Sequence, residues 1–391
     1  MNSSAEPFLP FAKPAISAAA IAEVTACLES GWITTGPRTK QFEKMLQEYV
    51  GAPSAQACSS ATAGLLMALL SLDLQPGEEV ITTPMTFAAT LNTIVLAGGV
   101  PVLVDVEPGT YNMDVTRLAK AITPRTRAIM PVHFAGLPVD LDPLYELARQ
   151  HKLRVIEDAA HSIGATYKGR KLGSFGDTQV FSFHPNKNMT TGEGGCVVTR
   201  DEAMVKRITL LRFHGIDREA WARFHKGGSP HYEIVLAGYK FNFMDLQAAL
   251  GIHQLPELDG FNRRRGELVN RYYEHVGAWK ALTLPSRPSY EHTHAWHLFA
   301  PLINPEVAGL DRDQFIDALK EHNVGTGVHY RAIHLSPFYQ DKYGFKRGDF
   351  PNAEAISDRV VSLPLFPTMT EHEQNRVIRA MAAIFKLSSP V

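Results

Sequence analysis

The sequence has little cysteine, no long apolar run and no excess of either charge. Cys27, Cys58 and Cys196 are its only cysteines in 391 residues, too few and too scattered for a disulfide framework or a cysteine-based zinc site. We expect all three to be small packing residues. Lys and Arg total 39 against 40 Asp and Glu, for a formal net charge of -1. This balance gives no electrostatic footprint for nucleic acid or for an acidic membrane surface.

No segment has the pattern of a targeting signal or of a membrane span. The start, MNSSAEPFLPFAKP, lacks the basic and apolar regions of a secretory signal, and no later stretch approaches a membrane-spanning run. The sequence therefore predicts a cytoplasmic protein with neither membrane nor nucleic acid as a partner. A hydrophobic content of 45% is enough for a full core, and the length favours a large domain plus a smaller one.

Short apolar runs alternate with helical patterns from about residue 50 to residue 200. The runs are EEVITTP, VPVLVDV, RAIMPVHF, RVIEDAA, TQVFSFH and GCVVTR. Such alternation is typical of an α/β protein with a mostly parallel sheet covered by helices. A helix over MDLQAALGIHQLPELDGFNRRRGELVNRYYEHV leads away from it, and the mixed pattern beyond predicts a smaller α+β domain, so we expect domains at 1–255 and 256–391. Residues 214–243 lack clear periodicity and are expected to form a long loop.

Ligands of such sheets bind beyond the carboxyl ends of the strands, where two features stand out. Asp158 follows RVIE, and a buried carboxylate needs a cation or hydrogen-bond donors. Capping of the next turn is the plainer explanation, and pairing with a protonated ring nitrogen is the functional one. Ser59, Ser60 and Thr62 open an apolar helix, whose first N–H groups are either simply capped or able to bind a phosphate.

Two further strand ends complete the pattern. Phe87 is able to stack on a planar ring, although a strand-end Phe is more often part of the core. Lys187, in FSFHPNKNMTTGEGG, is either a solvated loop lysine or an amine with a lowered pKa that forms a Schiff base with an aldehyde. Ser182 adds a hydroxyl for the anion, and the glycines leave room for a bound group. Aldehyde capture, ring-nitrogen charge, stacking and phosphate binding are together the requirements of pyridoxal phosphate.

Competing motifs are less consistent. GEGG precedes a strand rather than a helix, and no GxxxxGK[ST] loop occurs. His292, His294 and His297 in HTHAWH resemble a metal cluster, but no acidic or cysteine ligand is near them, so we expect no metal. His133 and His184 fit hydrogen-bonded strand-end histidines better than metal ligands.

Over nearly its whole length the chain resembles the DegT/DnrJ/EryC1/StrS family of pyridoxal-phosphate-dependent sugar aminotransferases. The resemblance runs from SGWITTGPRTKQFEKMLQEYVG through SSATAGLLMAL, VIEDAAHSIGATYKG, SFHPNKNMTTGEGG and GYKFNFMDLQAALGIHQL to GTGVHYRAIHLSPFY and SLPLFPTMT. It implies the aspartate aminotransferase fold (fold type I), a homodimer with shared active sites, glutamate as the amino donor and a nucleotide-linked ketosugar as acceptor. GVHYRAIHLSPFY most resembles the branch that acts on the C4 ketone of UDP-linked sugars, which includes the 4-amino-4-deoxyarabinose enzymes.

The matching positions imply roles for individual residues. Lys187 matches the lysine that binds the cofactor through a Schiff base and then moves the proton between the substrate carbon and the cofactor. Asp158 matches the carboxylate paired with the pyridine nitrogen, and His161 stands where the family has His or Gln beside the ring. Phe87 matches the aromatic residue that stacks on the cofactor ring. Residues that match the phosphate-binding positions are Ala61, Thr62 and Ser182.

Other segments supply candidates for the partner subunit and the substrate. In GYKFNF, Lys240 stands where many relatives have Asn, and Asn242 where they have Arg or Lys, so either residue is a candidate for the phosphate ligand that crosses between subunits. The substrate-side candidates come from the N-terminal segment, from the segment FSFHPNKNMTTGEGG around Lys187, here called the lysine loop, and from the C-terminal part of the chain. They are Trp32, Thr34 to Gly36, His184, His329, Tyr330 and Arg331.

Two other functions remain as alternatives. Sugar dehydratases of the same family use pyridoxamine phosphate and have His at the lysine position, so Lys187 argues against them. A non-enzymatic regulator that keeps the fold and the cofactor ranks lower, because the near-neutral chain shows no DNA-binding segment.

Overall fold

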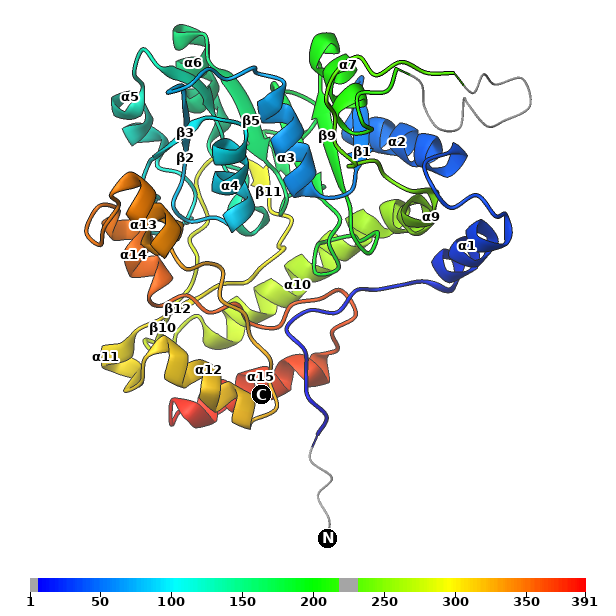
Figure 1. The fold of residues 1–391 in the computed structure, drawn as a ribbon. Coiled ribbons are helices and arrows are strands. Elements are labelled where there is room, and N and C mark those ends of the chain that lie inside the picture. Colours follow the sequence, from blue (N-terminus) through cyan, green and yellow to red (C-terminus); the bar gives the residue numbers. More distant parts are fainter. Residues whose placement is uncertain (1–5, 218–230) are drawn as a thin grey trace.

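The computed structural model describes residues 6–217 and 231–391 (Figure 1). A seven-stranded sheet has the order β1-β9-β8-β5-β4-β2-β3, in which β9 is antiparallel to both neighbours and all other pairs are parallel. The strands are β1 (Ala55–Cys58), β2 (Glu79–Thr82), β3 (Val100–Leu103), β4 (Thr126–Ile129), β5 (Arg154–Asp158), β8 (Thr178–Ser182) and β9 (Gly195–Thr199). The predicted α/β class with a mostly parallel mixed sheet is confirmed.

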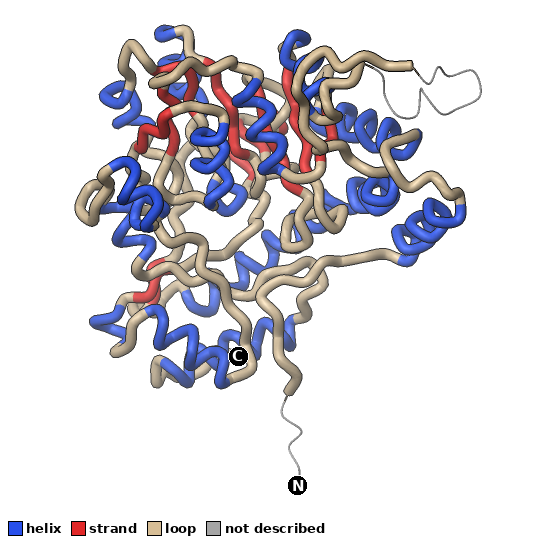
Figure 2. Tube along the Cα trace, in the orientation of Figure 1, coloured by secondary structure: helices blue, strands red, loops and turns tan. Residues whose placement is uncertain are grey.

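Helices cover both faces of this sheet (Figures 1 and 2). On one face lie α3 (Ala61–Leu70), α4 (Ala88–Leu96) and α7 (Glu202–Leu211), and on the other lie α2 (Pro37–Val50), α6 (Leu141–His151) and α9 (Asp245–Gln254), with α1 (Ala18–Glu29) packed on α9. Short α5 (Leu118–Ala121) precedes β4.

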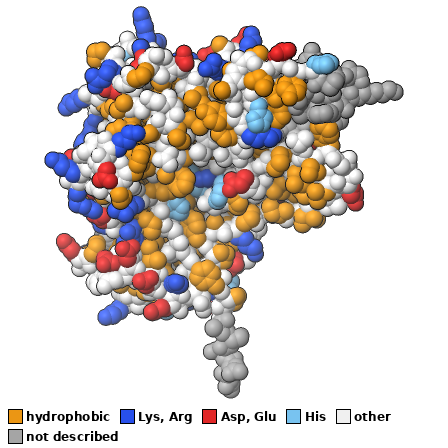
Figure 3. Space-filling view, in the orientation of Figure 1, with side chains coloured by type: hydrophobic (Ala, Val, Ile, Leu, Met, Phe, Trp, Pro, Cys, Tyr) orange, Lys and Arg blue, Asp and Glu red, His pale blue; other side chains and the backbone are white. Residues whose placement is uncertain are grey.

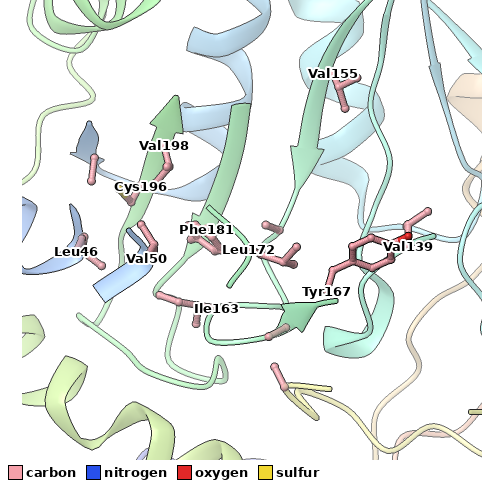
Figure 4. Close-up of a cluster of buried hydrophobic side chains, with 14 of the residues drawn as sticks. Leu46, Val50, Val139, Val155, Ile163, Tyr167, Leu172, Phe181, Cys196 and Val198 are labelled. Carbon is pink, nitrogen blue, oxygen red and sulfur yellow. The ribbon is translucent and has the colours of Figure 1, made fainter. Parts of the chain in front are cut away.

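The sheet holds these two helix layers because adjacent side chains of a strand point to opposite faces. Val180 of β8 lies in the cluster beneath α3 and α7, whereas its neighbour Phe181 lies in the cluster beneath α2. Figure 4 shows this second cluster, with Leu46 and Val50 of α2 beside Phe181 and Val198 of the sheet. Both faces of the central strands are therefore buried, and the polar strand ends are left for a ligand.

The C-terminal part of the chain is built on α10 (Leu258–Val276). The helix expected to run through MDLQAALG and beyond is interrupted between α9 and α10 by a 3-10 turn, Leu255–Glu257, because Pro256 lacks an N–H to continue the ladder. Further elements are β10 (Leu282–Thr283), β12 (Leu302–Ile303), α11 (Pro305–Ala308), α12 (Arg312–Glu321), α13 (Pro337–Tyr343), α14 (Pro351–Ser357) and α15 (Glu371–Ile384), while β11 (His292–Thr293) pairs with β6 (Thr166–Tyr167) and β7 (Arg170–Lys171) completes that small sheet.

A separate hydrophobic cluster joins α10, α12 and α15, and Leu9 of the N-terminal segment belongs to it. The backbone of Leu9 also pairs with Asn323 and Gly325, so the start of the chain runs beside its C-terminal part (Figure 1). The division into domains at residue 256 stays a prediction. Of the expected loop 214–243, residues 218–230 lie outside the described part, and the described remainder forms isolated bridges only.

None of the helices in 6–217 and 231–391 combines the length and the hydropathy that crossing a bilayer requires.

Candidate active site

A cavity of about 220 Å³ opens at the carboxyl ends of β5 and β8, next to the first turn of α3. Segments far apart in the sequence, from Ser60 to Tyr330, border it. Most of the predicted site residues line this cavity: Ala61, Thr62, Phe87, Asp158, His161, Ser182, His184, Lys187, His329 and Tyr330.

Lys187 lies in the connection between β8 and β9, where its backbone N–H donates to the carbonyl of His184 at 2.9 Å. Burial lowers the pKa of its amine to about 8, although the nearby Asp158 carboxylate favours the charged form. The amine therefore loses its proton at a lower pH than an ordinary lysine does, and the neutral form is the nucleophile.

Asp158 ends β5 and is 6% exposed. Its Oδ2 accepts a hydrogen bond from Thr90 Oγ1 at 2.7 Å, and its Oδ1 accepts one from the Ala160 N–H at 3.2 Å. Thr90 is in turn 2.6 Å from the hydroxyl of Thr86, so that Thr86 donates to Thr90 when Thr90 donates to the carboxylate. Burial raises the pKa of Asp158, and the Thr90 hydroxyl opposes that rise. Such a carboxylate is poised to receive a cationic group from the cavity.

His161 lies beside the cavity and links the sheet to the C-terminal part of the chain. Its Nδ1 accepts from the Ala135 N–H at 3.2 Å, and its Nε2 is 2.9 Å from the Tyr330 hydroxyl. Burial holds the pKa of His161 well below its usual range, and the charge of Lys187 lowers it further. A neutral ring with Nδ1 as acceptor carries its proton on Nε2, so His161 donates to Tyr330. The Tyr330 hydroxyl hydrogen is thereby left free for a ligand.

The first turn of α3 forms the end of the cavity suited to an anion. Ser60 caps the helix by accepting from the Ala63 N–H at 3.1 Å, while the first-turn N–H groups of Ala61 and Thr62 have no partner within the helix. A side chain at Gly195 would place its Cβ 2.5 Å from the Ala61 nitrogen, so only glycine lets β9 lie this close to the helix start. The result is a cradle of backbone donors, with Ser182 on the neighbouring strand.

Phe87 precedes α4 and is 60% exposed, which is unusual for a large aromatic side chain. Its ring centroid lies 6.0 Å from that of Tyr330. The ring therefore borders the cavity with much of its surface open, as stacking on a planar ligand requires.

The other predicted residues are not among those that line the cavity. Lys240 Nζ donates to Asn242 Oδ1 at 2.5 Å, and Asn242 Nδ2 donates to Thr35 Oγ1 at 2.8 Å. Trp32 and Thr34 belong to the same group, through bonds of Trp32 Nε1 to the Thr35 carbonyl and of the Asp245 N–H to the Thr34 carbonyl. Arg331 donates to the Leu335 carbonyl at 3.2 Å.

The structure adds a site residue that sequence reasoning missed. His297 is 2% exposed, and its Nε2 lies 3.4 Å from Lys187 Nζ. The motif HTHAWH was the only feature of the sequence that drew attention to His297. Its other two histidines lie in different surroundings, since His292 bonds the Tyr290 carbonyl and His294 stacks on Trp296. Within the described ranges, no three His, Cys, Asp or Glu side chains converge as a metal site.

Comparisons with known proteins agree with this geometry. The family model of the DegT/DnrJ/EryC1/StrS aminotransferase family matches residues 14–382. The spore coat polysaccharide biosynthesis protein SpsC of Bacillus subtilis is 45% identical over 380 residues, 97% of each chain.

Two solved structures share the fold. The putative sugar aminotransferase Spr1654 from Streptococcus pneumoniae in its PMP form has a TM-score of 0.89 at 33% identity, covering 97% of this chain and 99% of that one, and it is also known in a PLP form. Helicobacter pylori PseC, an aminotransferase involved in the biosynthesis of pseudoaminic acid, has a TM-score of 0.90 at 27% identity, covering 97% and 100%. The predicted fold type, cofactor and enzyme class are confirmed, and the chain belongs to the pyridoxal-phosphate-dependent DegT/DnrJ/EryC1/StrS aminotransferase family.

Proposed function

We propose that this protein transfers the amino group of glutamate to the C4 ketone of a UDP-linked sugar, and that the product serves amino-sugar and surface-glycan biosynthesis. The convergence of Lys187, Asp158 and the first turn of α3 on one cavity supports this proposal most directly. The names of SpsC and PseC, one in spore coat polysaccharide biosynthesis and one in pseudoaminic acid biosynthesis, support a role in making glycan sugars.

The cavity fits pyridoxal phosphate. The backbone donors of Ala61 and Thr62 and the hydroxyl of Ser182 suit the phosphate. The buried Asp158 carboxylate, whose two oxygens are oriented by Thr90 and Ala160, suits a protonated ring nitrogen. Bound there, the cofactor supplies an electron sink for proton removal at the carbon that carries the amine.

The chain's own residues would divide the remaining work. Lys187 would bind the cofactor through its amine and, once released, move the proton between carbons as a base whose pKa lies near the working pH. Phe87 would cover one face of the ring, and His161 would hold Tyr330 in place through their hydrogen bond. His184, His329 and Tyr330, at the cavity wall, would contact substrate.

The test uses the purified enzyme, glutamate labelled with ¹⁵N and a panel of UDP- and dTDP-linked 4-ketosugars. Glutamate alone should convert the cofactor to its amine form, seen in the absorbance spectrum. Addition of the right ketosugar should restore the first spectrum and give an amino sugar that carries ¹⁵N. A dehydratase would instead release a deoxygenated sugar without the label, and a regulator would leave glutamate and sugar unchanged.

Thr90 offers a test of the assignment of Asp158. Thr90→Val keeps the shape but removes the donor to Asp158 Oδ2, so we expect the pKa of Asp158 to rise and kcat to fall about 10-fold, the effect of one hydrogen bond to a charged group. Steady-state kinetics and a pH titration of the cofactor absorbance measure both effects. Thr93→Val is the matched control, because the Thr93 hydroxyl donates to the Thr90 carbonyl at 3.1 Å and not to the Asp158 carboxylate. Equal kinetics for the two variants would contradict the assignment.

We also propose a homodimer in which Lys240 or Asn242 of one chain completes the phosphate site of its partner. Figure 3 shows hydrophobic side chains gathered over α1 and the adjoining middle of the face that carries the cavity. The residues of this apolar surface include Ile21, Leu28, Ile33 and Phe87, which are between 45% and 60% exposed. An apolar surface of this kind is typical of a contact with another protein, and its continuity with the cavity favours a shared site.

Leu28→Glu should weaken this association. A buried interface carboxylate without a partner is unfavourable, so we expect the dimer to dissociate at least about 30-fold more readily, as for a hot-spot residue. Light scattering after size exclusion would report monomers, with activity lost in parallel. Val307→Glu, at a similarly exposed position on α11, is the control and should remain dimeric. A monomeric wild-type protein with full activity would contradict the shared site.

A further inference from the structure

His297 is a buried polar side chain with one polar side-chain contact. Its Nε2 lies 3.4 Å from Lys187 Nζ, whereas its Nδ1 has no hydrogen-bond partner among the described residues. A buried polar atom without a partner is unfavourable, and an apolar side chain of similar size would avoid that penalty. The contact with Lys187 is therefore what distinguishes this imidazole from a packing residue.

The main chain around His297 is tied to the lysine loop. Asn188, which follows Lys187, donates through Nδ2 to the carbonyl of Ala295 at 2.6 Å. On the other side, Arg265 of α10 donates to the carbonyls of His297 and Leu365 at 3.3 and 3.0 Å. These bonds fix the main chain from which the imidazole projects toward the amine.

The ring itself is held in place and uncharged. It packs against His161 with 4.4 Å between ring centroids. Burial holds the pKa of His297 well below its usual range, and the positive charges of Lys187 and Arg265 lower it further. A neutral imidazole keeps a lone pair with which it can accept a hydrogen bond.

We propose that His297 is a positioning residue for Lys187, accepting a hydrogen bond from the amine through Nε2 and holding that amine at the cavity when it is not linked to the cofactor. This inference rests on the proposed role of Lys187 as the cofactor-binding residue. During each half-reaction the lysine must be released and then re-engaged, and a fixed acceptor keeps it within reach.

Loss of the acceptor should change the basicity of the amine. The other titratable and charged groups around this pair come from several elements: Asp158 on β5, His133 and His161 in the loops beside it, Arg265 on α10, and His329 and Tyr330 after α12. Because all of these stay in place when only His297 is replaced, a change in the pKa of Lys187 is assigned to the imidazole.

The test measures the amine in cofactor-free protein by acetic anhydride labelling of Lys187 across a pH series, with peptide mass spectrometry as the readout. In His297→Phe we expect the labelling midpoint to move about one pH unit to lower pH, the size expected for one hydrogen bond to a charged group. His297→Gln, whose Oε1 reaches toward the former Nε2 position, should restore the midpoint. His297→Asn, which is shorter, should behave like the Phe variant.

A wild-type midpoint in a folded His297→Phe protein would overturn the proposal. If that variant does not fold, the Asn and Gln variants decide the matter, since equal midpoints for these two would also overturn it. The labelling needs neither cofactor nor substrate. Its outcome is therefore separate from failure of the proposed function, which would appear as full transamination by a protein without Lys187.

Discussion

Lys187→Ala is expected to lower transamination by about 10⁴-fold or more, the effect of removing a group that is both nucleophile and proton carrier. The backbone donors proposed to hold the phosphate and the Asp158 carboxylate belong to other segments of the cavity wall than the lysine, so we expect cofactor binding to persist in noncovalent form. Single-turnover kinetics with glutamate measure the first effect. The absorbance spectrum measures the second, since the band of the covalently bound cofactor should be replaced by that of the free aldehyde.

Lys206→Ala is the control for this variant, because Lys206 is an exposed lysine on α7. It should retain wild-type rates and the wild-type spectrum. Normal transamination by Lys187→Ala would refute the central assignment, and the amine responsible would then have to be sought elsewhere.

Asp158→Asn is expected to reduce kcat by about 100-fold or more, comparable to the loss of one preorganised electrostatic contact. Asparagine has nearly the same shape and still accepts the Thr90 hydrogen bond, but it carries no negative charge for the ring nitrogen. The comparison with Asp142→Asn, an exposed position on α6, controls for removal of a charge alone. Unchanged kcat in Asp158→Asn would show that the ring nitrogen has another partner.

The same substitution should stabilise the cofactor-free protein. Burial raises the pKa of Asp158 in the folded state above its ordinary value of 3.8, so the folded state binds this proton more tightly than the unfolded state does. Protonation of Asp158 therefore stabilises the folded state. This stabilisation is fully present below the pKa that Asp158 has in the unfolded chain, and it is lost as the pH rises through the pKa of Asp158 in the folded protein. At pH 7 we therefore expect cofactor-free Asp158→Asn to have a higher Tm than the wild type, with a difference that narrows toward about pH 4. A lower Tm across this range would contradict the raised pKa.

Local patterns in the sequence were sufficient to predict the large sheet and part of the cavity wall: Thr62, Phe87, Asp158, Ser182 and Lys187. Ala61, His161, His329 and Tyr330 were indicated only by the family resemblance. Apolar runs bounded by turns predict every strand of the large sheet except β1, whose residues AQAC have low β-propensity and are held by pairing with β9. Asp158 could be singled out because it ends a buried strand with a charge, and Lys187 because it lies between an aromatic run and a glycine-rich run at another strand end. The 3-10 turn that separates α9 from α10 was missed, although Pro256 marks it.

Contacts between distant segments could not be predicted in this way. His297 lies beside Lys187 because α10 and the segment after β11 pack against the lysine loop, and this packing leaves no periodicity in HTHAWH. Arg331 stays a predicted substrate contact, and its guanidinium donates to the Leu335 carbonyl in this chain. Lys240 and Asn242 form a group with Trp32 and Thr34, away from the cavity wall of their own chain. Contacts between distant segments are decided by tertiary packing, and the local sequence preferences of each segment do not reveal them.

The lysine loop joins two interior strands of the sheet. Ser182 at the end of β8 pairs with Gly195 at the start of β9, and the Phe183 N–H continues the ladder to the Gly194 carbonyl at 2.9 Å. Local unfolding of this loop therefore requires opening strands that are flanked on both sides, unlike a loop at a sheet edge. Amide hydrogens at the base of the loop should exchange with solvent nearly as slowly as those of the core, so the Lys187 amine is presented by a loop whose base resists local opening.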